Sequence, residues 1–354
     1  MDFSNGMLWA PLIGLAGGVL LGLAARRGRF CTLGAIEDAL YAHDLSRIRM
    51  WAVALGVAIA GTFALDAVGL VDLTVTMYAA ISWNPVGSVL GGLIFGYGMA
   101  IAGNCGFGAL ARFGGGDLRS LVIVIVTGLS AYAVLSGPLA GLRVALFAPQ
   151  PSDAAGAATG YAHALSGWIG LAPAIPAFAI AGLILIWALA DRRFRRAGGQ
   201  IFWACIVGIA ITSAWAGTTL LARQSFDVVA VESHSFTAPF GETLLYLMTA
   251  STGGGPSFAI GSVVGVVIGA LLGSLSKGQF RWEACDDPGE LGRQILGGVL
   301  MGIGGVLAVG CSVGQGLTAF STLAYSAPIV LAAIVLGAAL GLRQLIQGFA
   351  LHSD

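Results

Sequence analysis

Long apolar runs alternate with short polar stretches along the whole chain. A helix needs about 20 mostly apolar residues to cross the hydrocarbon core of a bilayer, and most of these runs approach that length. The pattern therefore predicts about nine transmembrane helices. The predicted spans are 8–25, 50–70, 86–104, 119–140, 167–190, 200–221, 257–275, 294–310 and 326–349.

Shorter apolar segments lie between these spans, at 32–42, 72–82, 241–250 and 312–321. They are too short to cross a bilayer. Irregular backbone at membrane depth is tolerated only where it is buried in protein or lines a cavity, so we expect re-entrant half-helices here. The predicted fold class is an all-α integral membrane protein, and residues 1–354 are expected to form a single membrane transport domain.

The chain also contains an internal repeat. LGGLIFGYGMAIAGNCGFG (90–108) aligns with LGGVLMGIGGVLAVGCSVG (296–314) at eight of nineteen positions, including Cys105 and Cys311. Two repeats with broken helices are typical of transporters, whose substrate site lies between the repeats. We predict a first half-repeat at about 8–147, connecting helices at about 160–240 and a second half-repeat at about 241–350.

Two further patterns bear on this repeat. RGRFC (27–31) weakly resembles KGQFR (277–281) at a different offset. Glycines four residues apart, at Gly92 and Gly96 and again at Gly298 and Gly302, predict close helix packing without any ligand.

Composition agrees with a membrane protein. Hydrophobic residues make up 57% of the chain and charged residues 10%, whereas a soluble domain carries about 25% charged residues. Lys+Arg and Asp+Glu balance at 17 each, so no basic surface suggests a nucleic-acid partner. The five cysteines contain no C-x-x-C pair, and we expect no disulfide framework, metal or cofactor.

Positive charge predicts the orientation in the membrane. Basic residues cluster after the first predicted span, again at 191–196, and again between 277 and 293. All three clusters are cytoplasmic if the N-terminus is periplasmic and the C-terminus is cytoplasmic. In that orientation the spans before Cys105 and Cys311 run in opposite directions, whereas the RGRF and KGQF loops stay on one side.

The glycine-rich breaks around Cys105 and Cys311 are the candidate substrate site. Glycines permit left-handed backbone and bare N–H groups, and N–H groups at a helix start bind anions. A cysteine adds a polarizable S–H donor, so the site suits a small anion that contains sulfur. The alternative is two buried structural cysteines at tight helix ends. The candidate residues are Cys105, Gly106, Gly108, Cys311, Ser312, Gly314 and Gln315.

Cys31 is a third candidate, because Arg29 could attract an anion to it. Arg281 lies in the similar KGQFR loop and is proposed for the same role. Cys205 lies within an apolar span and is expected to be a core residue. Cys285 lies in a loop beside three acidic residues and is expected to be inert.

The motifs RRGRFC, AGNCGFG, VGCSVGQG and KGQFR together resemble the YeeE/YedE family of inner-membrane sulfur transporters. The resemblance implies thiosulfate uptake across a bacterial inner membrane through an hourglass-shaped helical fold. It implies that Cys31, Cys105 and Cys311 pass thiosulfate along by S–H···S contacts. It also implies a small cytoplasmic sulfurtransferase-like partner. Asn104 and Val309 depart from the Gly-Gly-Cys context that is frequent in the family.

Two other functions fit parts of the pattern. A membrane sulfurtransferase would take the terminal sulfur as a cysteine persulfide, which requires an activating base near the thiol. A Cu(I) transporter would use the thiolates as soft ligands, although Met-rich clusters and C-x-x-C pairs are missing from the sequence.

Overall fold

The computed structural model describes residues 6–80, 83–147, 160–225, 229–251, 255–284 and 287–347. Within these ranges the chain forms helices and one isolated β-bridge, and no strand. The long helices are α1 (Gly6–Arg27), α3 (Ser46–Ala67), α5 (Pro85–Ala102), α7 (Leu118–Leu135), α10 (Ala174–Leu189), α12 (Gly198–Gln224), α14 (Phe258–Leu275), α15 (Pro288–Leu307) and α16 (Ser326–Gln347).

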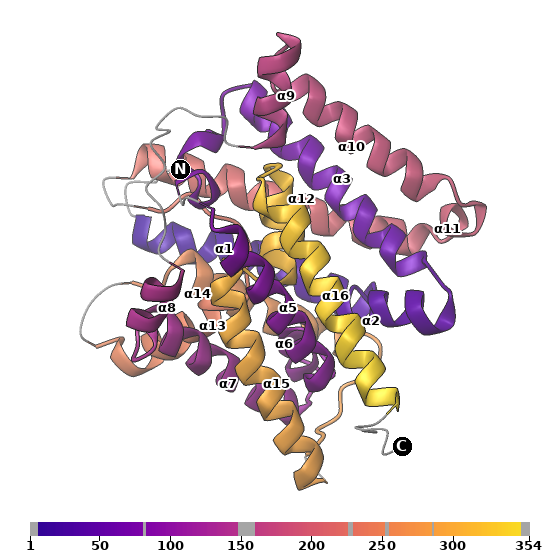
Figure 1. The fold of residues 1–354 in the computed structure, drawn as a ribbon, viewed down its shortest axis with the longest axis vertical. Coiled ribbons are helices and arrows are strands. Elements are labelled where there is room, and N and C mark those ends of the chain that lie inside the picture. The colour runs from indigo at the N-terminus through magenta and orange to yellow at the C-terminus, as the bar shows by residue number, and fades with distance from the viewer. Residues whose placement is uncertain are drawn as a thin grey trace.

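Short helices connect or interrupt the long ones (Figure 1). They are α2 (Thr32–Glu37), α4 (Met77–Ala80), α6 (Gly106–Phe113), α8 (Ala140–Leu146), α9 (Tyr161–Ile169), α11 (Arg192–Arg196) and α13 (Ala238–Thr249). Two π-helical turns, Asp38–Ala42 and Gly314–Ala319, and a 3₁₀ turn at Leu73–Val75 complete the described elements.

The predicted fold class is confirmed: the protein is an all-α integral membrane protein. Seven described helical segments are long and apolar enough to cross a membrane, and each coincides with one predicted span. The other two predicted spans are also helical. At 167–190 the apolar helix α10 has 16 residues, and at 294–310 lies α15, whose first turns carry Glu290 and Arg293.

The predicted short segments are present as well. Segment 32–42 forms α2 and the π turn after it, and 312–321 is one short helix with a π-helical centre. Segment 241–250 lies in α13 up to Thr249, and the described part of 72–82 forms a 3₁₀ turn and α4. The helix α6, directly after Cys105, is an additional half-helix.

Local sequence signals set the ends of the repeated helices. The Asn84 side chain accepts a hydrogen bond from the N–H of Gly87, and Pro85 occupies the first turn of α5. Asp287 and Pro288 do the same at the start of α15. These are favoured residues for the beginning of a helix. Gly103 ends α5 in a left-handed conformation, as helix ends often require.

Glycines bring α5 and α15 into backbone contact. A methyl group at Gly98 would lie 2.7 Å from the Gly297 carbonyl oxygen, and one at Gly304 would lie 2.7 Å from that of Gly91. Both distances are too short for a real side chain, so only glycine permits this approach. Because Gly91 meets Gly304 and Gly98 meets Gly297, the two helices are antiparallel.

The glycines four residues apart also pack as predicted. Gly92 and Gly96 of α5 contact α16, and Gly298 and Gly302 of α15 contact α7. In each case a methyl group would meet backbone atoms of the neighbouring helix.

The helices pack in matching pairs. α5 packs on α16 and α15 packs on α7, and both pairs are parallel. α1 packs on α14 and α12 packs on α3, again with parallel chains. Helix α10 packs on α3 at the edge of the molecule (Figure 1).

The parallel packing of α1 and α14 places the RGRF and KGQF loops at the same end of the molecule. The Lys277 ammonium donates hydrogen bonds to the carbonyl oxygens of Arg26 and Arg27, at 3.3 and 3.1 Å. These loops are therefore neighbours, and their similarity does not relate two inverted halves.

Candidate functional site

The three candidate cysteines each stand at the start of a short helix. Cys31 directly precedes α2, Cys105 precedes α6, and Cys311 precedes the short helix 312–321. Cys105 and Cys311 are fully buried, whereas Cys31 is half-buried. Each therefore stands where a helix begins inside the protein and not in a loop at its surface.

Cys31 and Cys105 lie next to each other around Gly108. The N–H of Gly108 donates to the Cys105 sulfur at 3.2 Å, so this sulfur caps α6. A methyl group at Gly108 would lie 3.3 Å from the Cys105 sulfur and 3.8 Å from the Cys31 sulfur. Because Gly108 has no side chain, both sulfurs lie close to one common point; Cys31 lines a cavity there, and Cys105 is buried behind it.

Cys311 has a similar arrangement in the second repeat. The N–H of Gly314 donates to its sulfur at 3.3 Å. The Ser235 hydroxyl lies 4.0 Å from the same sulfur. The Gly108 and Gly314 N–H groups, expected to bind anion oxygens, thus orient the thiols in this structure.

The segments that carry the cysteines meet in the interior. The Thr32 hydroxyl, one residue after Cys31, donates to the Ser312 hydroxyl, one residue after Cys311, at 3.1 Å, and both groups are buried. Gly106, one residue after Cys105, packs against Phe236 and against Phe240 of α13. Residues far apart in the sequence are thereby joined in one central cluster.

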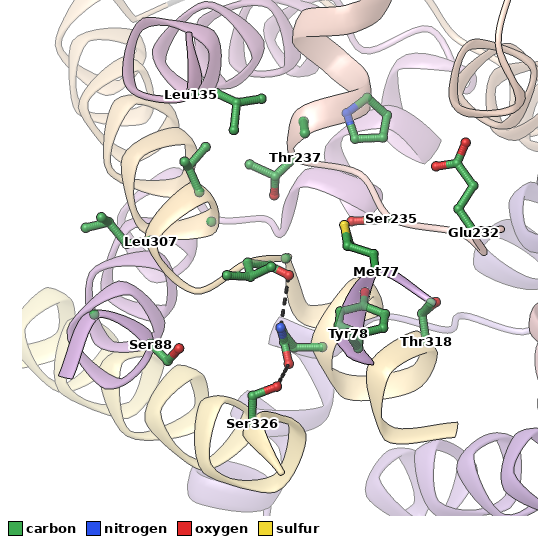
Figure 2. A pocket seen from close by; sticks show the side chains of 18 of the residues that line it. Met77, Tyr78, Ser88, Leu135, Glu232, Ser235, Thr237, Leu307, Thr318 and Ser326 are labelled. Atoms are coloured by element: carbon green, nitrogen blue, oxygen red, sulfur yellow. Dashed lines mark hydrogen bonds between the residues drawn. The ribbon is translucent and has the colours of Figure 1, made fainter. Parts of the chain in front are cut away.

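Two cavities approach this cluster. One, called the glutamate cavity because Glu232 and Glu242 line it, has a volume of about 700 Å³ (Figure 2). The other, called the arginine cavity because Arg26, Arg29, Arg47 and Arg112 line it, has a volume of about 310 Å³. Asn84 at the start of α5 lines the first, and Gly103 and Asn104 at its end line the second. The cavities therefore enter from opposite ends of α5.

The arginine cavity is strongly basic. Cys31 and Gly108 line it beside the four arginines, and Glu37 is its one lining carboxylate among the described residues. The Arg47 guanidinium lies against Gly34 of α2 and pairs with Asp38 at 3.1 Å. Such a cavity attracts anions, because arginine presents several donors and always carries its charge.

The structure brings one of the two proposed anion-attracting arginines to the site. Arg29 lines the arginine cavity, with a left-handed backbone (φ 56°). Arg281 does not line it; its backbone N–H donates to the Gly115 carbonyl in the loop that follows α6. Sequence reasoning did not select Arg112 of the arginine cavity, although it lies seven residues after Cys105, two turns along one face of a short helix.

Gln315 lines the glutamate cavity, but its side chain binds the protein. Its amide NH₂ donates to the carbonyl oxygens of Ala308 and Val309, both at 2.9 Å, and its oxygen accepts from Ser326 at 3.3 Å (Figure 2). These bonds hold the turn before Cys311, where Val309 has a positive φ of 55°.

The segment 229–237 between α12 and α13 carries two titratable groups with shifted pKa values. Burial and the nearby Glu242 carboxylate raise the pKa of Glu232 to about 7. Burial lowers the pKa of His234 to about 3, so this imidazole is neutral at ordinary pH. Its Nδ1 lies 2.6 Å from the Ser262 hydroxyl.

The remaining cysteines lie elsewhere. Cys205 is a half-buried residue of α12 that packs against the apolar core, as expected. Cys285 lies outside the described residues.

Comparison with known proteins identifies the family of the chain. Residues 27–340 match the model of a family described as sulphur transport. The chain is 28% identical over 339 residues to the thiosulfate transporter TsuA of Spirochaeta thermophila, which covers 94% of this chain and 97% of that protein. It is 29% identical over 348 residues to TsuA of Escherichia coli, also a thiosulfate transporter, which covers 92% of each chain.

Proposed function

This chain belongs to the sulphur transport family, and we propose that it carries thiosulfate across a bacterial inner membrane past Cys31, Cys105 and Cys311. The observation that supports this most directly is the position of the cysteines. Their segments meet between two cavities that enter from opposite ends of α5. An anion that moves from one cavity to the other must pass these groups.

The chemistry of thiosulfate suits this path. Thiosulfate carries oxygens at one end and a soft, polarizable sulfur at the other. A thiol can donate a hydrogen bond to that sulfur without holding it as strongly as a full positive charge would. Weak binding is needed because a transported ion must leave each site. Gly106, Gly108, Ser312 and Gly314 shape the passage beside the cysteines in this proposal, and Gln315 holds the turn before Cys311.

Charge supports an orientation of the protein in the membrane. We propose that the arginine cavity faces the cytoplasm, because the basic clusters of the chain lie at its end. The N-terminus is then periplasmic and the C-terminus cytoplasmic. A membrane-impermeant thiol reagent tests this with an Arg195→Cys variant, which must stay unlabelled in intact cells and react after lysis. Labelling of intact cells would refute the orientation.

Growth tests the proposed substrate. A bacterium that lacks its own sulfur-uptake systems is grown with thiosulfate as its sulfur source, with and without this protein. We expect growth only with the protein, and parallel cultures on sulfite or sulfate to report selectivity. Absence of growth on thiosulfate, with normal abundance of the protein in the membrane, would contradict the proposal.

We propose that transport occurs without a persulfide intermediate. In the part of the chain that the structure describes, the polar neighbours of Cys105 and Cys311 are backbone N–H groups, the Cys31 thiol and the Ser235 hydroxyl. None of these is a general base of the kind that a persulfide-forming enzyme uses. Mass spectrometry after exposure to thiosulfate should therefore find unmodified cysteines. A persulfide that forms and turns over would favour the sulfurtransferase.

We further propose that the anion is released to a small cytoplasmic sulfurtransferase-like protein. The supporting feature is the resemblance of the motifs to the YeeE/YedE family together with the basic cavity at the proposed cytoplasmic end. Co-elution of the purified chain with such a protein tests this, and separate elution at micromolar concentrations would count against it.

A further inference from the structure

The surroundings of Gly108 and Gly314 are alike, although one partner differs. These glycines occupy equivalent positions in the sequence repeat. A methyl group at Gly108 would lie near the sulfurs of Cys105 and Cys31. A methyl group at Gly314 would lie 3.8 Å from the Cys311 sulfur and 2.6 Å from the Ser235 oxygen. Ser235 therefore occupies, beside Gly314, the place that Cys31 occupies beside Gly108.

Helix packing supports the same correspondence. The contact of α1 with α14 is matched by that of α12 with α3, and the contact of α5 with α16 by that of α15 with α7. Helix α2 packs on α3 and α16, and α13 packs on α14 and α7. All these pairs match if α12 and α13 correspond to α1 and α2. The second half then begins at α12, and only α9 to α11 connect the halves.

Individual contacts agree with this assignment. If Cys31 corresponds to Ser235, then Thr32 corresponds to Phe236, and Ser312 corresponds to Gly106 by the sequence repeat. Thr32 bonds to Ser312, and Phe236 lies against Gly106 through its carbonyl oxygen. The central contact between the halves thus occurs twice, once in each direction.

We propose that Ser235 is a substrate-binding residue, so that the glutamate cavity holds the anion between the Ser235 hydroxyl and the Cys311 thiol. The arginine cavity holds it between the Cys31 and Cys105 thiols. This inference rests on the proposed transport of thiosulfate and adds a fourth group to the path.

The Ser235 hydroxyl is available for this role. It lines the glutamate cavity (Figure 2), and its one polar contact among the described residues is the Cys311 sulfur at 4.0 Å. Ser233, two residues earlier, also lines this cavity, but its hydroxyl is already engaged, because it donates to the Ile211 carbonyl oxygen at 3.0 Å. A ligand can therefore bind Ser235 without breaking a strong bond of the protein.

Because serine and cysteine differ as hydrogen-bond donors, the Ser235–Cys311 pair and the Cys31–Cys105 pair should prefer different ends of the anion. A hydroxyl is a stronger donor to oxygen than a thiol is. The pair of Ser235 and Cys311, with one hydroxyl and one thiol, suits both ends of thiosulfate. The pair of Cys31 and Cys105, with two thiols, favours the soft sulfur and disfavours an anion that has oxygens alone.

Initial rates of radiolabelled thiosulfate uptake into cells test the role of Ser235. We expect Ser235→Ala to raise the half-saturating concentration about ten-fold or more, the range for loss of a hydrogen bond to a charged group. Ser235→Cys should restore uptake, because it reproduces the pair of thiols found at Cys31 and Cys105. Ser233→Ala is the matched control and should leave the half-saturating concentration within about two-fold of the original, since its bond is to backbone.

The outcomes separate this proposal from the proposed function. Normal uptake by Ser235→Ala, with loss of uptake by Cys105→Ala, would overturn the role of Ser235 and leave thiosulfate transport intact. A second measurement tests the role of Ser235 even if the alanine variant folds poorly. Alkylation of Ser235→Cys at residue 235, followed by mass spectrometry, should be slowed by thiosulfate, and an unchanged rate would also overturn the proposal.

Discussion

At the scale of single residues, the sulfurs of Cys105 and Cys311 accept hydrogen bonds from the N–H groups of Gly108 and Gly314. Each sulfur therefore acts as a helix cap by accepting, and this bond does not use its own S–H hydrogen. In this structure Cys105 hydrogen-bonds to the Cys31 thiol, and Cys311 lies 4.0 Å from the Ser235 hydroxyl. One atom thus serves the fold by accepting and can serve transport by donating. Substitutions can separate these two roles.

Serine separates the capping role from the transport role, because it is a favoured helix cap but lacks the sulfur. We expect Cys105→Ser and Cys311→Ser to keep the protein folded and to lower thiosulfate uptake about ten-fold or more, since the shorter, harder hydroxyl is a poor match for a soft sulfur. Uptake and membrane abundance are measured together. The matched control is Cys205→Ala, which should transport normally.

Alanine at the same positions should add a folding defect, because loss of a helix cap costs about 1 kcal/mol. Full uptake by the Cys105→Ala, Cys311→Ala double variant at normal abundance would make both cysteines packing residues only.

Residue identity predicted only part of the site. Cysteine in a glycine-rich break is conspicuous in a sequence, so Cys31, Cys105 and Cys311 could be selected. Ser235 could not, since serine is common and nothing around it resembles RGRFC. Arg281 was selected from a local resemblance, but Arg281 itself does not line the arginine cavity, which its loop reaches through Gln279.

At the scale of helices, close contacts between glycines fix how α5 and α15 cross. A methyl group at Gly304 would lie 2.7 Å from the Gly91 carbonyl oxygen. In contrast, a methyl group at Gly182 of α10 would meet no atom within 4 Å. The two positions are both inside helices, so they differ in packing and not in helix propensity.

We expect Gly304→Ala to lower the midpoint of thermal unfolding in detergent by several degrees and to reduce uptake. Overpacking of this kind costs about 1–3 kcal/mol. Gly182→Ala should be neutral or slightly stabilising, because alanine is a better helix former than glycine by up to about 1 kcal/mol. Equal melting of the two variants would mean that the close crossing is not needed for stability.

Apolar length and helix signals were sufficient to predict the position of most helices. Asn84 with Pro85, and Asp287 with Pro288, mark helix starts that any reader of the sequence can see. The pairing of helices could not be predicted, because glycines occur on many helix faces and lipid-facing and buried positions are equally apolar. The weak similarity of RGRF and KGQF therefore suggested a relation that the parallel packing of α1 and α14 does not support.

At the scale of the whole molecule, the two cavities differ in charge: four arginines line one, and two glutamates with one arginine line the other. The described residues of the glutamate cavity include Glu232 and Glu242, with Arg143 as a basic residue whose guanidinium donates to the carbonyl oxygens of Val134 and Leu135. Tyr78 of α4 also faces this cavity. A dianion that enters is repelled by Glu232 when that carboxyl group is ionised.

This charge predicts a pH dependence of uptake. The pKa of Glu232 is raised to about 7, so the group is mostly neutral below that pH and mostly ionised above it. Thiosulfate uptake should therefore fall as the external pH rises through about 7. His234, next to this cavity, does not titrate in this range because its pKa is lowered to about 3.

Two variants test whether Glu232 causes the pH dependence of uptake. Glu232→Gln should remove it, and Glu242→Gln should move its midpoint to lower pH, because the Glu242 carboxylate helps to raise the pKa of Glu232. Initial uptake rates between pH 6 and 8 provide the measurement, with the membrane potential held constant. An unaltered profile in Glu232→Gln would assign the dependence to another group.

The backbone contacts between α5 and α15 also restrict how the molecule can move. With carbonyl oxygens of each helix packed against glycines of the other, the two helices cannot slide or rock without losing several contacts at once. A transport cycle in which one half tilts against the other would break these packing contacts at every turnover. We therefore expect α5 and α15 to stay fixed against each other during transport, so that any shift is left to segments outside this crossing.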